Sequence, residues 1–132
     1  MNILVVEDNR VQSRIVKRCL DQRRRGDFVK VVPDAEEALK LLRDNAMQFD
    51  LLLLDWMRPS TSGIDVLQRV RQSGRHSDVR VIMQTAKDRK EHVEQAIEAG
   101  ADDYLVKPLD CEALLRKVRK YDPDPSAPFG EV

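Results

Sequence analysis

Short runs of apolar residues alternate along the chain with longer segments in which apolar positions recur at helical spacing. The five apolar runs are residues 3–6, 28–32, 51–54, 79–83 and 104–106. Strands that alternate with helices need crossover connections, so this pattern predicts a parallel sheet with helices on both faces. The runs ILVV and LLLL are apolar throughout, which is typical of central strands covered on both sides.

The first two helices are predicted from apolar spacing and from a capping signal. The first follows Asp8, and its apolar face consists of Val11, Ile15, Cys19 and Leu20. The second begins at Asp34, which has the spacing of a capping box with Glu37. Its inward face consists of Ala35, Ala38, Leu39 and Leu42.

The other three helices complete five strand and helix units. The third is predicted over about residues 63–74 and the fifth over about 110–118. Asp88 with Glu91 repeats the capping box before the fourth helix, and Gly100 is placed to end it. At such positions a single Asp is usually a helix cap, and we interpret Asp110 in the same way.

The length of 132 residues suits one domain with a tail. Residues 1–121 are predicted to form the domain, and residues 122–132, which contain three closely spaced prolines, a linker or tail. No apolar run is long enough to span a bilayer, and Met1 to Val6 lacks the features of a signal peptide, so we expect a cytoplasmic protein without a membrane segment.

Charge and cysteine content exclude some functions. Lys plus Arg and Asp plus Glu both total 23, so there is no general basic field and we expect no direct nucleic-acid binding. The basic run 23–25 is interpreted as a solvated helix end. Cys19 and Cys111 lie in helical apolar patterns and are predicted to be buried free thiols rather than a disulfide or a metal pair.

Polar residues that could carry chemistry follow four of the predicted strands. They are Glu7 and Asp8 after the first, Asp55 after the third, Thr85 after the fourth and Lys107 after the fifth. In an open parallel sheet ligands bind beyond the carboxyl ends of the strands, so these side chains are expected at one edge. Three converging carboxylates repel one another unless a cation is present, and oxygen ligands favour Mg²⁺.

With a cation bound, Asp55 could act as a carboxylate nucleophile toward a phosphoryl donor. Thr85 supplies a hydroxyl donor and Lys107 an ammonium, and both groups suit an incoming phosphoryl group. The pattern predicts phosphoryl transfer onto Asp55.

Four motifs, ILVVEDN, LLLLDWMRPSTSG, VIMQTA and DDYLVKP, resemble in order and spacing the receiver domain of two-component response regulators, the CheY-like superfamily. The resemblance covers about residues 2–121. It implies a flavodoxin-like α/β fold, a three-layer (βα)5 sandwich whose five parallel strands have the order 2-1-3-4-5.

The resemblance also implies a role for each matching residue. Asp55 would be the phosphorylation site, Asp8 and Asp55 would bind Mg²⁺ (or Mn²⁺) directly, Glu7 would act through metal-bound water, and the backbone carbonyl of Met57 would complete the protein ligands. The switch pair would be Thr85, which moves to the phosphoryl group, and Tyr104, which turns inward. Lys107 would pair with the phosphoryl group, and the Lys107–Pro108 peptide would be cis.

Some positions depart from the family pattern. Arg58 stands where an apolar residue is usual, and Trp56 is bulky for the position after Asp55. Met57 and Lys87 match positions that tune the lifetime of the phosphoryl group, which their identities leave open.

The resemblance implies a histidine kinase or histidine phosphotransfer protein as phosphodonor, and a phosphoacceptor that assists its own phosphorylation and dephosphorylation rather than an enzyme. The output would be read on the fourth helix, fifth strand and fifth helix, with phosphorylation-dependent homodimerisation as one option. One rival is an interaction module that does not use phosphorylation. A phosphatase with an aspartyl-phosphate intermediate would need a second aspartate at position 57, where this chain has methionine.

Overall fold

The computed structural model describes residues 1–23, 25–44, 48–55, 63–73, 78–86 and 90–123. Strands and helices alternate along the whole described chain. They are β1 (Asn2–Val6), α1 (Arg10–Asp21), β2 (Phe28–Val32), α2 (Ala35–Asp44), β3 (Leu51–Asp55), α3 (Gly63–Gln72), β4 (Arg80–Thr85), α4 (Lys90–Ala99), β5 (Asp103–Val106) and α5 (Cys111–Lys120). The predicted strands and helices are therefore all present, with ends shifted by a few residues. Gly74, Asp88 and the departures Trp56, Arg58 and Lys87 lie outside the described residues.

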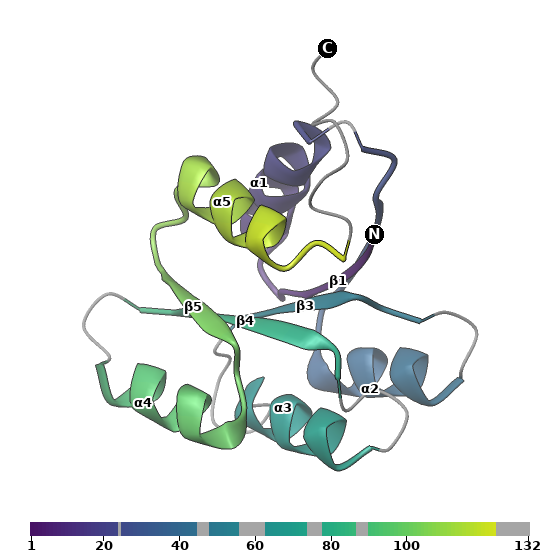
Figure 1. Ribbon diagram of the computed structural model, residues 1–132, viewed down its shortest axis with the longest axis vertical. Coiled ribbons are helices and arrows are strands. Elements are labelled where there is room, and N and C mark those ends of the chain that lie inside the picture. The colour runs from purple at the N-terminus through teal and green to yellow at the C-terminus, as the bar shows by residue number, and fades with distance from the viewer. Residues whose placement is uncertain (24, 45–47, 56–62, 74–77, 87–89, 124–132) are drawn as a thin grey trace.

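The five strands form one parallel sheet in the order β2-β1-β3-β4-β5, as the resemblance implied. Helices α1 and α5 cover one face, and α2, α3 and α4 cover the other, so the domain has three layers (Figure 1). The central strand β3 is buried at every position, whereas the edge strands β2 and β5 are partly exposed. This is why LLLL is apolar throughout: both of its faces meet a helical layer.

Two separate apolar clusters hold the layers together, one on each side of the sheet. Alternate strand residues supply each cluster, because neighbouring side chains on a strand point to opposite faces. On the α1 and α5 side the sheet contributes Ile3, Val5, Leu51, Leu53, Ile82 and Leu105. On the other side it contributes Leu4, Val6, Leu52, Leu54, Val81 and Met83.

Two of the predicted helix ends show their physical cause. The Asp34 side chain accepts a hydrogen bond from the backbone N–H of Glu37 at 2.9 Å, which confirms it as the cap of α2. Gly100 has a φ of +110°, a left-handed conformation that ends α4 and that glycine adopts without steric cost.

The predicted inner face of α1 is partly wrong. Val16, Cys19 and Leu20 are buried, but Val11 is 64% exposed and Ile15 39% exposed. Successive residues turn by about 100° around a helix, so Ile15 lies well to the side of the buried stripe centred on Val16. Apolar spacing found the helix but misjudged which side of it faces the sheet.

The prediction of free thiols is also wrong. Cys19 of α1 and Cys111 of α5 form a disulfide, with Cα atoms 5.5 Å apart. The two residues are separated by 92 positions in the sequence, and the packing of α1 beside α5 brings them together (Figure 1). Sequence spacing carries no information about such a long-range contact.

The basic run is not a solvated helix end throughout, because Arg23 is fully buried. Its Nε lies 2.6 Å from an Asp27 carboxylate oxygen, and its Nη2 lies 2.6 Å from Asp122. The N-terminal ammonium of Met1 binds the other Asp27 oxygen at 3.0 Å. These contacts join the end of α1 to the beginning of the sheet and to the residues after α5, so Asp122 packs with the domain although the sequence placed it in the tail.

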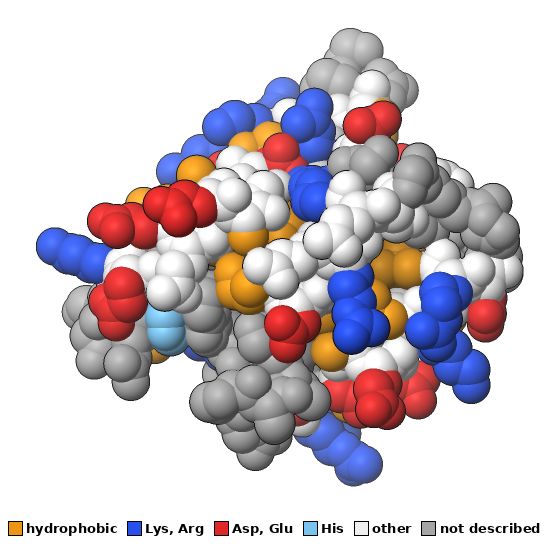
Figure 2. Space-filling model, turned by 90° about the horizontal axis from the view of Figure 1, so that it is seen from below, with side chains coloured by type: hydrophobic (Ala, Val, Ile, Leu, Met, Phe, Trp, Pro, Cys, Tyr) orange, Lys and Arg blue, Asp and Glu red, His pale blue; other side chains and the backbone are white. Residues whose placement is uncertain are grey.

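Surface charge agrees with the balanced composition. Figure 2 views the face formed by α2, α3 and α4, where Lys and Arg side chains are interspersed with Asp and Glu and with small apolar areas. Among the described helices, none has both the length and the apolar character needed to cross a bilayer.

Candidate functional site

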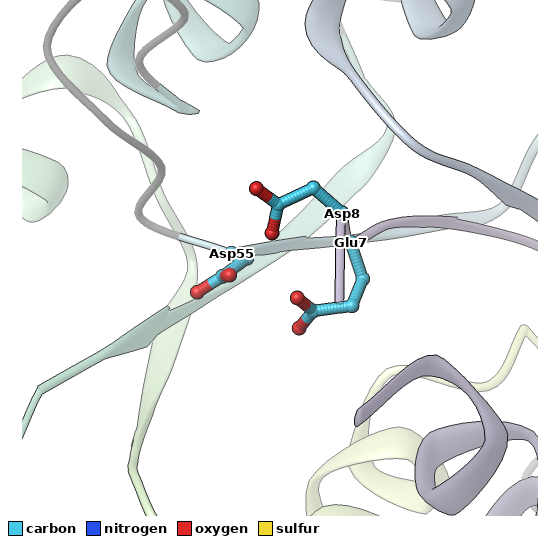
Figure 3. Close-up of side chains that lie close together, drawn as sticks. All are labelled: Glu7, Asp8 and Asp55. Carbon is cyan, nitrogen blue, oxygen red and sulfur yellow. The ribbon is translucent and has the colours of Figure 1, made fainter. Parts of the chain in front are cut away.

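The carboxyl ends of β1 and β3 bring three acidic side chains together. These strands are neighbours, with Val6 in register with Leu54, so the residues that follow them lie side by side. The carboxylates of Glu7, Asp8 and Asp55 each offer an oxygen within 4.8 Å of the other two (Figure 3). Glu7 and Asp55 are buried, whereas Asp8 is exposed. The structure thus assembles the acidic cluster that the strand ends predicted.

Glu7 shows how unfavourable this arrangement is for negative charge. Burial and the nearby charge of Asp55 together raise the pKa of Glu7 to about 7, although a hydrogen bond from the Asn9 N–H acts in the opposite direction. Its Oε1 atom is buried without a hydrogen-bond partner among the described residues. A buried carboxylate oxygen without a donor is the environment that a divalent cation relieves.

Lys107 supplies positive charge to the site. Its Nζ lies 2.6 Å from Asp55 Oδ1. The lysine follows β5, and its N–H donates to the Thr85 carbonyl at 2.8 Å, which continues the pairing of β5 with β4. The Lys107–Pro108 peptide is cis, as the resemblance implied.

Thr85 is the last residue of β4 and is 2% exposed. Its hydroxyl donates to the carbonyl of the next residue, Ala86, at 3.3 Å, so no strong hydrogen bond fixes it. Tyr104 on β5 is 38% exposed and has the Lys117 ammonium 5.6 Å from its ring centre. Its ring faces outward in this structure. Met57, predicted to supply a backbone ligand, lies outside the described residues.

Gly63 lets α3 begin close to the end of β3. A Cβ atom at this position would lie 2.8 Å from the Asp55 carbonyl oxygen and 3.0 Å from Met83 Cε. Any larger side chain would therefore push the helix away from the strand that carries Asp55. Glycine at the end of the motif LLLLDWMRPSTSG has a steric cause in the site itself.

Gln84 is a polar residue at the site that sequence reasoning missed. It is 1% exposed, and both its side-chain oxygen and nitrogen lack hydrogen-bond partners among the described residues. It is in register with Asp55 on the neighbouring strand. Because residues two apart on a strand point the same way, its side chain points with that of Ile82 toward the face covered by α1 and α5. The signal in the sequence was a glutamine between the apolar run VIM and Thr85.

Comparison with known proteins agrees with this architecture. The family model of the response regulator receiver domain matches residues 3–119, and the chain belongs to this family. It is a phosphoacceptor signalling domain of two-component systems, and the class is defined by phosphoryl acceptance rather than by enzymatic turnover.

Relatives include both longer and similarly short proteins. The transcriptional regulatory protein CpxR of Klebsiella pneumoniae subsp. pneumoniae is 41% identical over 117 residues, covering 89% of this chain and 47% of CpxR. This chain therefore spans about half the length of that relative. The chemotaxis protein CheY of Pseudomonas aeruginosa is 34% identical over 122 residues, covering 91% of this chain and 94% of CheY.

Among solved structures, the chain is similar to the receiver domain of the sensor histidine kinase PA1611 from Pseudomonas aeruginosa PAO1. The TM-score is 0.79 with 28% identity, and the match covers 91% of this chain and 95% of that domain. That receiver domain holds a magnesium ion coordinated in its active site cleft.

Proposed function

We propose that Asp55 accepts a phosphoryl group with Mg²⁺ (or Mn²⁺) bound beside it, and that this modification switches the output surface of the domain. The observation that carries the proposal is the carboxylate cluster of Glu7, Asp8 and Asp55 with the Lys107 ammonium on Asp55. Converging carboxylates repel one another unless a cation is present, and these side chains are oxygen ligands suited to a hard cation.

The donor set fits a divalent cation. Asp8 and Asp55 would bind it directly, Glu7 would bind through water, and the Met57 carbonyl would complete the protein ligands. Support comes from the buried, unpartnered Glu7 Oε1 and from the raised pKa of Glu7. When bound, the cation would neutralise the carboxylates and the oxygens of an arriving phosphoryl group.

The chain's own residues would carry the transfer. An Asp55 oxygen would attack phosphorus while the bond to the donor breaks, and a leaving imidazole of a donor histidine would then take up a proton. Lys107 would exchange its contact with Asp55 for one with the phosphoryl oxygens. Thr85, whose hydroxyl has only a weak contact, would move to the phosphoryl group, and Tyr104 would turn inward into the space that Thr85 leaves.

The partners follow from the family. A histidine kinase or histidine phosphotransfer protein would be the phosphodonor, and α4, β5 and α5 would form the output face. Because the chain spans about half of CpxR, the output could act through an attached domain as well as through a binding partner or a homodimer formed on phosphorylation. We propose residues 1–121 as the receiver domain and 122–132 as a linker or tail whose first residue, Asp122, is held against the domain by Arg23. We also propose a cytoplasmic location.

Trp56 allows a direct test, because the single tryptophan of the chain is next to Asp55 in the sequence. Its fluorescence would be followed during titration with Mg²⁺ and then with beryllofluoride or a small phosphodonor. We expect a saturable change with Mg²⁺ and a second change with the phosphoryl mimic. The Asp55→Asn variant should lack the second change. A folded wild-type protein that responds to neither addition would instead be an interaction module that does not use phosphorylation.

A further inference from the structure

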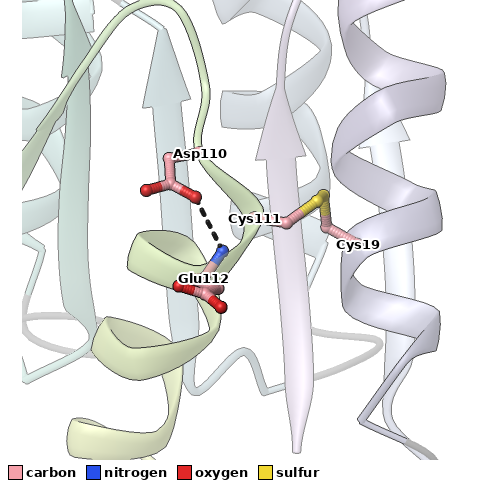
Figure 4. The surroundings of a disulfide bond; sticks show 4 residues. All are labelled: Cys19, Asp110, Cys111 and Glu112. Carbon is pink, nitrogen blue, oxygen red and sulfur yellow. Dashed lines mark hydrogen bonds between the residues drawn. A yellow bond between two sulfur atoms is a disulfide. The ribbon is translucent and has the colours of Figure 1, made fainter.

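The disulfide between Cys19 and Cys111 holds the start of α5, the helix that follows Lys107 in the chain. Cys111 is the first residue of α5, and Asp110 caps this helix by accepting a hydrogen bond from the Glu112 N–H at 3.0 Å (Figure 4). The short segment 107–111 connects this helix start to Lys107, which contacts Asp55. The bond therefore fixes one end of the segment that carries the lysine of the site.

The other end of the bond is firmly embedded. Cys19 is 1% exposed and packs in the apolar cluster shared by α1, α5 and the sheet, beside Val16 and Leu20. Cys111 is partly exposed and only borders this cluster. Cys111 is therefore the more accessible of the two residues to an external thiol, whereas Cys19 is shielded.

We propose that Cys19 and Cys111 form a reversible thiol and disulfide site that, when oxidised, pins the start of α5 to α1. This inference concerns a modification of the fold and does not depend on phosphorylation at Asp55. In a reducing compartment disulfides are rare, so there the pair would be reduced and would close on exposure to oxidised thiols. Closing or opening the bond would change how firmly the segment that carries Lys107 is held.

The chemistry balances as thiol and disulfide exchange with a small disulfide, such as an oxidised low-molecular-weight thiol. The Cys111 thiolate attacks the small disulfide, forms a mixed disulfide and releases one small thiol. The Cys19 thiolate then attacks Cys111 Sγ and releases the second. The two cysteines lose two electrons and two protons, which the small disulfide takes up. Reduction by a dithiol follows the reverse route, with attack at the more accessible Cys111.

The proposal is tested by equilibrating the folded chain with mixtures of reduced and oxidised glutathione as the probe. Free thiols are then trapped with an alkylating reagent and counted by mass spectrometry. We expect full loss of two alkylatable thiols in the oxidised mixtures and full recovery with a dithiol. Two thiols that remain alkylatable in every mixture would overturn the proposal.

Consequences for the fold provide the second measurement. Closing a loop of this length should raise Tm on the order of 10 °C in the oxidised form. Amide hydrogen exchange should slow in 107–111 and in the first turn of α5. Cys111→Ser, at the more exposed position, and Cys19→Ala, which keeps an apolar side chain in the cluster, should each show the same Tm and exchange in both mixtures. A cross-link that forms without changing Tm or exchange in 107–111 would show that it does not constrain α5, contrary to the proposal.

Discussion

Two groups of charged side chains lie at opposite edges of the sheet, and they differ in how their charge is balanced. At the edge formed by the amino ends of the strands there are short ion pairs among Arg23, Asp27, Asp122 and the N-terminal ammonium. At the carboxyl edge the carboxylates of Glu7, Asp8 and Asp55 lie together, and the Lys107 ammonium pairs with Asp55. The first group has as many cationic as anionic members, whereas in the second three carboxylates lie beside one lysine.

This difference separates a structural charge cluster from a functional one. Burial alone would raise the pKa of Asp27, but hydrogen bonds from Arg23 and the N-terminus outweigh it and lower that pKa below its usual value. Burial raises the pKa of Glu7 to about 7, and the neighbouring Asp55 adds to the effect. A lowered pKa marks a carboxylate whose charge is stabilised within the fold, whereas a raised pKa beside other carboxylates marks a candidate functional site.

The largest expected effect on stability is at the balanced cluster. Arg23→Met should lower the free energy of unfolding by about 3–5 kcal/mol, because it leaves Asp27 and Asp122 buried without their main partner. Urea denaturation would measure this loss. As a control, Arg80→Gln removes a 57% exposed partner of Asp102 and should cost less than about 1 kcal/mol. Equal losses in the two variants would contradict the assignment of the buried cluster.

At the carboxyl edge, adding a ligand should raise the free energy of unfolding, whereas the Arg23 substitution lowers it. Mg²⁺ at about one hundred times its dissociation constant should raise the free energy of unfolding by about 2.7 kcal/mol. The gain should largely disappear in Asp8→Asn, which removes a carboxylate from the cluster. Thermal denaturation with and without Mg²⁺ would show it. An equal gain in wild type and variant would place the cation elsewhere on the protein.

Low pH should remove the stabilisation that paired, partly buried carboxylates such as Asp27 contribute. Asp103 also has a lowered pKa: burial opposes the shift, but hydrogen bonds from Lys117, the Tyr104 N–H and Tyr121 outweigh it. Because these folded-state pKa values lie below the ordinary 3.8, the unfolded chain binds protons first as the pH falls. The stabilisation is therefore complete above the unfolded value and is lost as the pH drops through the folded one.

Urea denaturation at a series of pH values from 6 to below 3 would measure this acid dependence. The slope should be smaller in Asp103→Asn, which removes one of the contributing carboxylates. A variant with the same acid slope as wild type would show that Asp103 does not contribute.

The smallest expected effect concerns Gln84. Gln84→Leu replaces a buried amide without hydrogen-bond partners by an apolar side chain of similar size, and should raise the free energy of unfolding by about 1 kcal/mol. The exposed Gln95 on α4 is the matched control, and Gln95→Leu should bring no such gain. Loss of stability in Gln84→Leu would mean that the amide has partners beyond the described residues.

The sequence predicted the parts of this molecule that depend on local pattern. Strand runs such as LLLL and the cap at Asp34 follow from burial on both faces and from a short hydrogen bond, and both are present. The acidic cluster could be predicted because parallel strands place their carboxyl ends at one edge. Strand order came from the resemblance rather than from the pattern.

The features that sequence reasoning missed depend on contacts between distant segments. The Cys19–Cys111 disulfide and the burial of Arg23 both require α1 and the region of α5 to be placed against each other. The exposed positions of Val11 and Ile15 depend on the rotation of α1 about its axis, which apolar spacing fixes only roughly.

The most direct test of the account is to locate the phosphoryl group itself. The folded chain would be incubated with a small acyl phosphate as phosphodonor and with Mg²⁺. The aspartyl phosphate formed on the protein would then be reduced with borohydride, which leaves a stable homoserine at the modified aspartate. Peptide mapping by mass spectrometry should then find the change at Asp55, only when Mg²⁺ is present, and not in Asp55→Asn. Modification at another residue, or none in a protein that binds Mg²⁺ and remains folded, would contradict the proposal that the negatively charged edge of the sheet is a phosphoacceptor site.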